Sequence, residues 1–173
     1  STTPRVREME PHEAPYLRRA AYLSIHAGDG PPPPAEIVDR PVFRRTWDAW
    51  GRGGDIAVVA AVGPEAPVGA AWVRCYSEDE PTYGYVAPEI PALDIALEPE
   101  YRGAGLGTAL MRELIRLVGA AGYDGISLSV DPDNRAMAFY RRLGFTEISR
   151  PRIIEDDRNP VMLLDLRDRG SHA

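Results

Sequence analysis

Residues 102–108, which read Arg-Gly-Ala-Gly-Leu-Gly-Thr, combine a basic side chain with closely spaced glycines. They follow an apolar segment that ends at Leu97 and is broken by Pro99. Glycine lets a backbone turn sharply and approach a ligand closely. The first amides of a helix have no partner within the helix, and the helix dipole favours an anion beside them. Because the Arg102 guanidinium carries donors suited to phosphate oxygens, the segment predicts a binding site for a phosphate or pyrophosphate.

Two common phosphate-binding motifs do not match this segment. A P-loop requires Gly-Lys followed by Ser or Thr, and no lysine stands between Leu106 and Thr108. The dinucleotide fingerprint G-x-G-x-x-G, started at Gly103, meets Thr108 where its last glycine belongs. The glycines alone leave a plainer interpretation open, in which they only shape a tight turn between a strand and a helix.

The segment resembles the coenzyme motif of the GNAT acetyltransferase superfamily, which is Arg or Gln, two residues, Gly, one residue, and Gly or Ala. Residues 102–107 match this motif in full. Residues 95–99 are similar to the family's central strand and its break, and Asn134 with the run 139–145 is similar to its second motif. The similarity covers residues 93–145, and two motifs at the proper separation are more specific than either one alone.

The resemblance implies that acetyl-CoA is the acyl donor, and it assigns contacts residue by residue. The backbone of one strand would face the thioester and pantetheine, at a place where two neighbouring strands splay apart. A glycine-rich turn would hold the pyrophosphate, and an asparagine would contact pantetheine. The strand residues are Ile95, Ala96 and Leu97. The turn residues are Arg102, Gly103, Ala104, Gly105, Leu106, Gly107 and Thr108, and the asparagine is Asn134.

Tyr140 is the catalytic residue that the resemblance implies. It would lie near the sulfur and donate a proton to the departing thiolate, which is general-acid catalysis. A tyrosine with a pKa near ~10 stays protonated at neutral pH and suits that role. The structural alternative is a core tyrosine that packs with Ala136 and Leu143 on one face of an amphipathic helix.

Asn134 departs from the family spacing, because it stands six residues before Tyr140, where most members have seven. Either the helix starts one residue later, or Asp133 takes the usual place. Asn134 is also well suited to cap that helix, and one residue could serve both roles.

The base that must take a proton from the acceptor amine is not assigned by the sequence. Some relatives carry a glutamate on the strand before Asn134, and the matching residue here is Ser129. Asp94 lies within an otherwise apolar strand that Glu89 precedes, and burial would raise the pKa of such a carboxyl. Strand alternation puts Asp94 on the face opposite Leu93, and we interpret it as a structural hydrogen-bond or ion-pair partner.

Other reactive or aromatic side chains give weaker signals. Cys75, the only cysteine, has no visible basic partner and is interpreted as a small core residue and not as an acyl-carrying nucleophile. The three histidines lack metal-ligand spacing, so no metal is expected. Four aromatic residues could line a substrate pocket, although such residues more often pack in a core. They are Trp47, Trp50, Tyr83 and Tyr85.

Composition and charge narrow the class of protein. The chain has 173 residues and a formal net charge of −6. No apolar run approaches the ~20 residues of a membrane helix. An acidic chain is a poor candidate for nucleic-acid binding and a better one for a cationic or amine substrate. We expect a single domain over residues 1–173 that is cytoplasmic, lacks a secretory signal, and is a monomer or a homodimer.

Hydrophobic periodicity predicts the elements that must position these groups. Strands are expected at residues 5–9, 56–62, 68–76, 92–97, 126–130, 146–149 and 161–166, the second and third of which form a hairpin. Helices are expected at residues 11–25, 105–121 and 134–143, the last ended by Gly144, with one or two shorter helices within residues 34–51. With the resemblance, this order predicts an α/β fold in which a GNAT-like mixed, mostly antiparallel central sheet is flanked by helices on both faces.

The leading hypothesis is an N-acetyltransferase that moves the acetyl group of acetyl-CoA to a primary amine by direct attack in a ternary complex. The amine could belong to a small molecule or a peptide, and its recognition would fall mainly to residues 16–51 and 77–91. The alternative is a non-catalytic acyl-CoA-binding sensor or interaction module of the same fold, and a nicotinamide-dependent enzyme ranks third. Tyr140 favours the enzyme, while the unassigned base favours the sensor.

Overall fold

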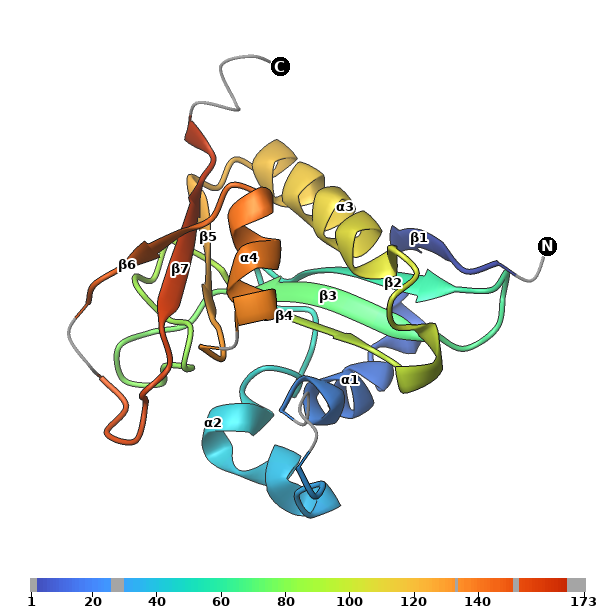
Figure 1. Ribbon diagram of the computed structural model, residues 1–173, viewed down its shortest axis with the longest axis horizontal. Helices are drawn as coiled ribbons and strands as arrows, with labels where there is room; N and C mark the ends of the chain where they lie inside the picture. The colour runs from blue at the N-terminus through green and yellow to red at the C-terminus, as the bar shows by residue number, and fades with distance from the viewer. Residues whose placement is uncertain (1–2, 26–29, 133, 151–152, 168–173) are drawn as a thin grey trace.

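The computed structural model describes residues 3–25, 30–132, 134–150 and 153–167. Within these ranges seven strands form one sheet in the order β1-β2-β3-β4-β5-β7-β6, with helices on both faces (Figure 1). The strands are β1 (Arg5–Glu8), β2 (Ile56–Ala61), β3 (Gly69–Arg74), β4 (Ala92–Leu97), β5 (Gly125–Ser129), β6 (Thr146–Ile148) and β7 (Val161–Asp165). The α-helices are α1 (Tyr16–Ile25), α2 (Pro41–Arg44), α3 (Leu106–Ala120) and α4 (Asn134–Arg142), and short 3-10 helices span Pro11–Glu13, Ala35–Asp39 and Pro99–Tyr101.

Neighbouring strands of this sheet are antiparallel except β4 and β5, which run parallel. β2 and β3 form the predicted hairpin, in which Val58 pairs with Ala71. Gly144, which follows α4, has φ +104° and so provides the predicted left-handed end of that helix. The predicted fold class, a mixed and mostly antiparallel sheet flanked by helices on both faces, is confirmed.

α3 covers one face of the sheet with a single apolar stripe. Its residues Leu110, Leu114 and Val118 are spaced four apart, and all three are fully buried together with Met111. They pack in a cluster with residues of β2, β3 and β5. Each buried side chain of this size contributes about 1.5–3 kcal/mol of transfer free energy. α3 is therefore held along its length, and the position of its N-terminus is fixed relative to β4.

α1 covers the opposite face of the sheet. Leu17 and Ala20 are fully buried against Trp72 of β3. The prediction of one helix over residues 11–25 is wrong at its start, because the structure has a 3-10 turn at Pro11–Glu13 and begins α1 only at Tyr16. Pro15 lies between the two, and proline can occupy the start of a helix but not continue one that is already running.

Arg74, at the end of β3, fixes the segment that leads from α2 to β2. Its side chain is 1% exposed and forms a bidentate ion pair with Asp55, with N–O distances of 3.0 and 2.8 Å. Its other N–H groups donate to the carbonyl oxygens of Arg45, Asp48 and Ala49. A buried guanidinium is tolerated only when its donors are matched, as they are here. The ion pair therefore holds residues 45–55 against the sheet.

Candidate active site

β4 and β5 separate immediately after they pair. Their parallel ladder has one Cα pair in register, Ala92 with Ser127, and the Ser127 amide donates to the Pro91 carbonyl at 3.0 Å. β4 then continues to Leu97 and stays paired with β3 over its whole length. Among the described residues, no strand therefore pairs with the β5-facing side of β4 beyond Ala92. A gap opens in the sheet at this point.

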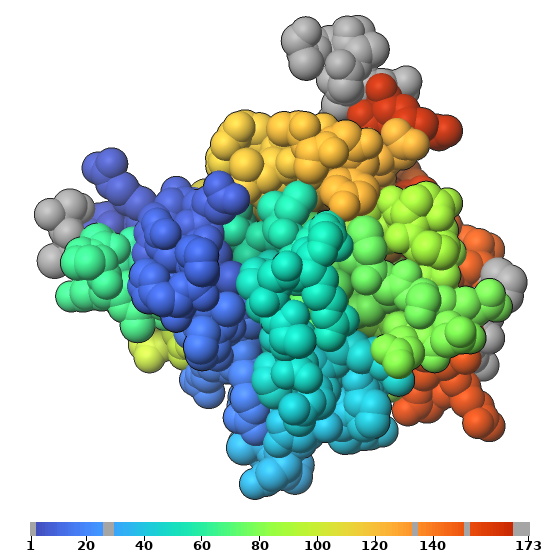
Figure 2. Space-filling view, turned by 180° about the vertical axis from the view of Figure 1, so that it is seen from behind, coloured from blue at the N-terminus to red at the C-terminus, as the bar shows by residue number. Residues whose placement is uncertain are grey.

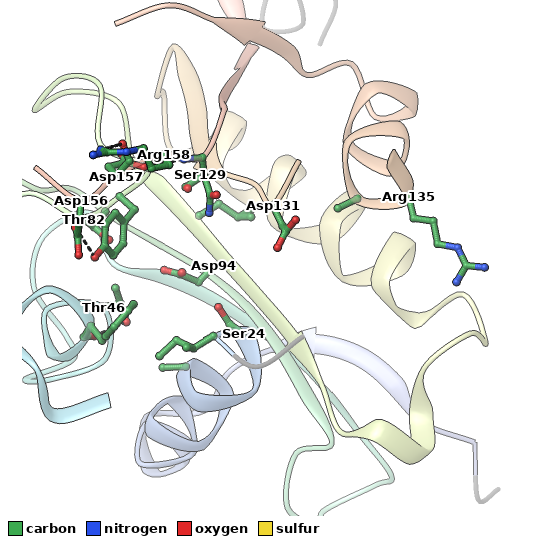
Figure 3. Close-up of a pocket in the computed structure, with 18 residues that line it drawn as sticks. Ser24, Thr46, Thr82, Asp94, Ser129, Asp131, Arg135, Asp156, Asp157 and Arg158 are labelled. Carbon is green, nitrogen blue, oxygen red and sulfur yellow. Dashed lines mark hydrogen bonds between the residues drawn. The ribbon is translucent and has the colours of Figure 1, made fainter. Parts of the chain in front are cut away.

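A cavity of about 740 Å³ lies at this gap (Figure 3). β4 contributes Leu93 and Asp94 to its lining, β5 contributes Ser129, and α4 contributes Ala136. The cavity also touches Ala21 of α1. Because α4 packs in the same cluster as α3 while α1 packs on the opposite face, the cavity connects the two faces of the sheet.

The glycine-rich turn between β4 and α3 has an exposed backbone. Gly103 and Gly105 adopt φ values of +80° and +84°, a region that favours glycine, and a Cβ added to either would meet no atom within 4 Å. Gly105 is the N-cap of α3, so the amides of Leu106 and Gly107 have no acceptor within the helix. The turn thus offers donors and open space together, as a phosphate site requires.

Gly107 brings this turn together with β4 and α4. A Cβ at Gly107 would lie 3.8 Å from Phe139 of α4 and 4.0 Å from Leu97 of β4. Arg102 is held at the same place, because its Nε donates to the Leu97 carbonyl at 3.3 Å. The elements that carry the predicted coenzyme contacts therefore meet at one end of the gap.

Tyr140 lies on α4 and packs against the core cluster on the α3 face of the sheet, and it is not one of the residues that line the cavity. Its ring packs edge-on against Phe139 and Phe145, with centroid distances of 5.2 and 5.7 Å. Burial raises the pKa of the Tyr140 hydroxyl above its usual value, and the negative charge of Asp94 adds to the effect. The hydroxyl is therefore protonated throughout the neutral range.

Asp94 lies on the other face of the same gap. It pairs with Trp72 of β3 and faces the α1 layer, so the predicted alternation with Leu93 is confirmed. Its carboxylate is directed into the cavity (Figure 3). Burial raises the pKa of this carboxyl to about 7. The interpretation of Asp94 as a hydrogen-bond or ion-pair partner is not borne out, because it has neither contact with any residue that the structure describes.

Three segments that are distant in sequence enclose the α1 side of the cavity. Figure 2 shows residues 41–50 in cyan, 78–90 in green and 153–158 in orange, meeting on the face turned away in Figure 1. Arg45 joins the first two, since it donates to the Pro81 carbonyl at 2.9 Å. The cavity wall on this side is therefore made of loops fastened to one another.

Tyr83 fastens the second and third of these segments. Its hydroxyl donates to Asp156 at 3.0 Å, and its carbonyl accepts from Arg150 at 2.6 Å. Arg150 also donates to the buried Asp157 at 2.6 Å. A second hollow of about 440 Å³ lies on the far side of Tyr83 and Asp156, which line both spaces. The Tyr83–Asp156 pair therefore separates the cavity from that hollow.

Other residues singled out from the sequence lie in different settings. Ser129 lines the cavity but has no group that titrates near neutral pH, and Glu89 is exposed and not part of the cavity lining. Cys75 is half-buried, and burial raises the pKa of its thiol, which opposes a nucleophilic role. Asn134 is the first residue of α4, but its side chain and the whole of Asp133 lie outside the described residues.

The four aromatic residues divide between core and cavity. Trp47 and Trp50 pack against the α1 cluster, and Tyr85 is buried beside Tyr76. Tyr83 alone among the four lines the cavity. For three of these residues the core interpretation was the better one.

Sequence reasoning missed several cavity residues. Thr46 and Thr82 lie in the two segments expected to recognise the acceptor, but no motif distinguished them. Asp156 lies between β6 and β7, a connection that carried no expectation at all. No local signal in the sequence could have found these residues, because they reach the cavity only through the packing of separate loops.

Two further properties concern the described part of the chain. Across it, no group of three or more His, Cys, Asp or Glu side chains is arranged to hold a metal ion. None of the helices in those same ranges has both the length and the apolar composition needed to span a bilayer.

Comparisons with known proteins agree with this architecture. The model of the acetyltransferase (GNAT) family matches residues 21–145, well over half of the chain. The chain is 30% identical over 105 residues to the peptidyl-lysine N-acetyltransferase YjaB of Salmonella typhimurium, a match that spans 60% of this chain and 66% of that protein. It is 34% identical over 95 residues to a mycothiol acetyltransferase of Kocuria rhizophila, across 53% of this chain and 29% of that one. The chain thus spans less than two thirds of these relatives' length.

Solved structures share the fold at low sequence identity. A GNAT superfamily phosphinothricin acetyltransferase from Sinorhizobium meliloti, in complex with AcCoA, superposes with a TM-score of 0.59 at 20% identity, covering 94% of this chain and 88% of that one. The GNAT family N-acetyltransferase YhbS from Escherichia coli, in complex with CoA, has a TM-score of 0.63 at 17% identity, covering 98% and 85%. The chain belongs to the acetyltransferase (GNAT) family.

Proposed function

We propose that this protein is an acetyl-CoA-dependent N-acetyltransferase that acts on a primary amine by direct attack in a ternary complex. The observation that carries the proposal is the gap between β4 and β5, which have one Cα pair in register. The unpaired side of β4 extends from the cavity at Leu93 to the glycine-rich turn that follows Leu97. A donor with a long arm and a pyrophosphate suits this path.

The residues along this path suit acetyl-CoA. The amides at the start of α3 and the Arg102 guanidinium would hold the pyrophosphate, and the open space at Gly103 and Gly105 leaves room for it. The exposed backbone edge of Ile95, Ala96 and Leu97 would pair with the amide-bearing pantetheine arm, and Asn134 would contact the same arm. The coenzyme supplies an acetyl group activated as a thioester.

Tyr140 is the proposed general acid. The acceptor nitrogen forms a C–N bond with the acetyl carbon, the C–S bond breaks, and the leaving sulfur takes the proton of the Tyr140 hydroxyl. Burial keeps this hydroxyl protonated at neutral pH, because its pKa is raised. The edge-on contacts with Phe139 and Phe145 restrain the Tyr140 ring.

The acceptor is proposed to be a primary amine of a small molecule or a peptide. The acidic side chains Asp94 and Asp156 line the cavity, and a carboxylate attracts an ammonium group. The Salmonella relative is a peptidyl-lysine N-acetyltransferase, and the fold neighbour from Sinorhizobium is a phosphinothricin acetyltransferase. These names suggest two acceptors for a first panel, a lysine-containing peptide and phosphinothricin. Spermidine is added as an aliphatic amine that carries positive charge, which the acidic lining would attract.

Calorimetric titration with acetyl-CoA, with NADH as a control, tests the coenzyme site. Saturable binding of acetyl-CoA alone is expected, and Gly105→Glu should abolish it by placing a carboxylate where the pyrophosphate would lie. Gly119→Glu, near the other end of the same helix, is exposed with nothing within 4 Å of an added Cβ, and it should leave binding intact. Failure of acetyl-CoA to bind would overturn the proposal.

Turnover is measured next by following free thiol while the amine panel is present. Formation of thiol and acetylated amine in equal amounts supports the enzyme. Saturable coenzyme binding without turnover on any amine of the panel would instead favour an acyl-CoA sensor of the same fold.

A further inference from the structure

We propose that Asp94 is the general base of the reaction, and that the α1 side of the cavity binds an aliphatic amine in its protonated form. This inference rests on the proposed function and adds the missing proton acceptor. It reverses the interpretation that the sequence alone favoured, in which Asp94 was a structural partner.

Asp94 lies beside the place proposed for the acetyl group. It directly precedes Ile95, whose backbone is proposed to face the thioester, and consecutive Cα atoms are about 3.8 Å apart. Its side chain points to the α1 face of the sheet, while Tyr140 lies on the α4 side of the same gap. Burial is the main cause of the raised pKa of Tyr140, and the charge of Asp94 adds to it because the two groups are close. A proton acceptor and a proton donor therefore flank the place proposed for the acetyl group.

Asp94 lies among buried residues, without a partner for its charge in the described part of the chain. Its carboxylate lines the cavity and has no hydrogen bond or ion pair with the residues that the structure describes. Trp72, its cross-strand neighbour, is fully buried, and Ala96, two residues along β4, is 8% exposed. A carboxylate held in such a setting without a partner destabilises the fold, so a ligand with a positive charge is its natural complement.

Other carboxyl groups near the cavity are less suited to the role. Asp156 accepts a hydrogen bond from Tyr83, and Asp157 is paired with Arg150. Asp131 also lines the cavity, but it is exposed and already interacts with another group. Glu89 is exposed and outside the cavity lining. In Figure 3 Asp156 and Asp157 lie across the cavity from Asp94. Asp94 is thus the carboxyl group that combines a place on β4 with an unpaired carboxylate.

The charged and titratable groups around Asp94 come from several elements. Burial is the cause of its raised pKa, which lies at about 7. Burial raises the pKa of Tyr76, just beyond β3, and of Tyr140, and the charge of Asp94 adds to both shifts, so neither hydroxyl is ionised near neutral pH. The other groups that face this cavity are Tyr83, Asp131, Arg135, Asp156, Asp157 and Arg158.

The chemistry requires such a group because an alkyl ammonium ion has no lone pair. Its pKa is about 10.4, so at neutral pH almost all of it is protonated. Asp94 takes one proton and leaves the neutral amine, which attacks the acetyl carbon. The C–S bond breaks, the sulfur takes the Tyr140 proton, and the second proton lost by the nitrogen returns to Tyr140 through solvent. The products are the amide, the free thiol and the proton on Asp94.

The test compares wild type, Asp94→Asn, Asp94→Glu and the matched cavity control Asp156→Asn. Profiles of kcat/KM against pH are measured with spermidine or the lysine peptide, whichever the wild type acetylates faster, and with hydroxylamine, which is mostly neutral at pH 7. Wild type should show activity that rises with pH through about 7. Asp156→Asn should keep this rise, although the loss of its charge should lower kcat/KM for the amine at every pH. Asp94→Asn should lose that rise and about 100–1,000-fold of kcat/KM for the alkyl amine, but much less for hydroxylamine. Asp94→Glu should regain part of the loss.

A second readout does not depend on turnover. In protein labelled with ¹³C at aspartate carboxyls, one resonance should titrate near pH 7 and be missing in Asp94→Asn, while calorimetry shows unchanged acetyl-CoA affinity. The assignment would be overturned if Asp94→Asn kept the rise of kcat/KM with pH through about 7, or if it lowered kcat/KM equally for both amines. Either result would leave the proposed function intact. Absence of amine acetylation by the wild type would instead overturn the proposed function, and the assignment of Asp94 as base would fall with it.

Discussion

The two ends of the gap between β4 and β5 are built in different ways. At the α3 end the proposed binding groups, apart from Asn134, are backbone groups and one arginine from a continuous stretch, residues 95–108. At the other end the cavity wall consists of side chains from α1, from residues 41–50 and 78–90, and from the connection between β6 and β7. The first end is defined by local backbone geometry and is readable as a motif, whereas the second exists only after separate segments have packed.

This contrast leads to a division of roles that mutations can test. Variants at the α3 end should change the affinity for acetyl-CoA and leave the amine unaffected. Variants around the cavity should change the use of the amine and leave the affinity for acetyl-CoA unaffected. Tyr140 and Asp94, which lie between the two ends, should change the rate or its pH dependence.

The largest effect is expected for Tyr140→Phe. Loss of the proton donor should lower kcat by about 100–10,000-fold, while the dissociation constant of acetyl-CoA stays the same. The folded protein should be unharmed, because the described residues give the Tyr140 hydroxyl no hydrogen bond to lose. Tyr123→Phe, a partly buried tyrosine beside Cys75, serves as the control and should keep full kcat. A wild-type kcat in Tyr140→Phe would show that Tyr140 is not the general acid.

Arg74→Met should have the largest effect on stability. It leaves the buried Asp55 carboxylate without its ion-pair partner, so the free energy of unfolding should fall by about 3–5 kcal/mol, measured by urea titration. Arg116→Met on α3 removes an exposed pair with Glu113 and should hardly move the transition midpoint. Equal losses in the two variants would show that Arg74 is not what holds the cavity segment.

Asp94→Asn should stabilise the protein in a pH-dependent way. The folded-state pKa of about 7 lies above the ordinary value of 3.8, so the folded state holds a proton that the unfolded state releases between these values. The stability contributed by the protonated form is therefore complete below about pH 4 and is lost as pH rises through about 7. Between pH 5 and pH 8, the gain in unfolding free energy of Asp94→Asn over wild type should grow by about 2–3 kcal/mol.

Urea titrations of both proteins at the two pH values measure this difference. A difference in unfolding free energy that stays constant with pH would mean that Asp94 has an ordinary pKa. A difference that grows with pH would show that the fold tolerates a destabilising carboxylate, which is typical of a group retained for function.

A smaller effect is expected for Arg102→Ala. Its exposed guanidinium is one contact among several amides, so acetyl-CoA should bind about 10-fold more weakly, and the affinity should become less sensitive to salt. Arg112→Ala, also exposed but further along α3, is the control for net charge. An unchanged KM for the amine in both variants would support the separation of the two ends.

The smallest effect is expected for Tyr83→Phe. Loss of the hydrogen bond to Asp156, between partly solvated groups, should raise the KM of the amine by about 2–5-fold with little change in kcat. The dissociation constant of acetyl-CoA, measured by calorimetry, should not change. A variant that weakens acetyl-CoA binding instead would contradict the division between the two ends.

Much of the fold could be predicted from patterns within single segments. The helical spacing of Leu110, Leu114 and Leu117 predicted α3, and the continuous apolar run over residues 56–62 predicted a buried strand. The start of α1 was misplaced because periodicity outweighed Pro15. The order of the last strands, with β7 between β5 and β6, was not predicted, because strand order depends on contacts that no single segment contains.

Asp94 shows most clearly what could not be predicted from the sequence. Its place in an apolar strand and its side of the sheet were both predicted, yet its role was not, because the sequence does not say whether a charged group has a partner.

The sequence by itself determined the family, the helix and strand periods, and the turn at Gly103 and Gly105, since these depend on neighbouring residues and on backbone geometry. The resemblance implied that two strands splay apart beside residues 95–97, but only the tertiary structure showed that β4 and β5 part directly after Ala92. It alone also decided that a cavity opens there and that Asp94 reaches this cavity without a partner among the described residues. The physical reason is that desolvation and pairing of a charge depend on all the segments packed around it, and those segments are far apart along the chain.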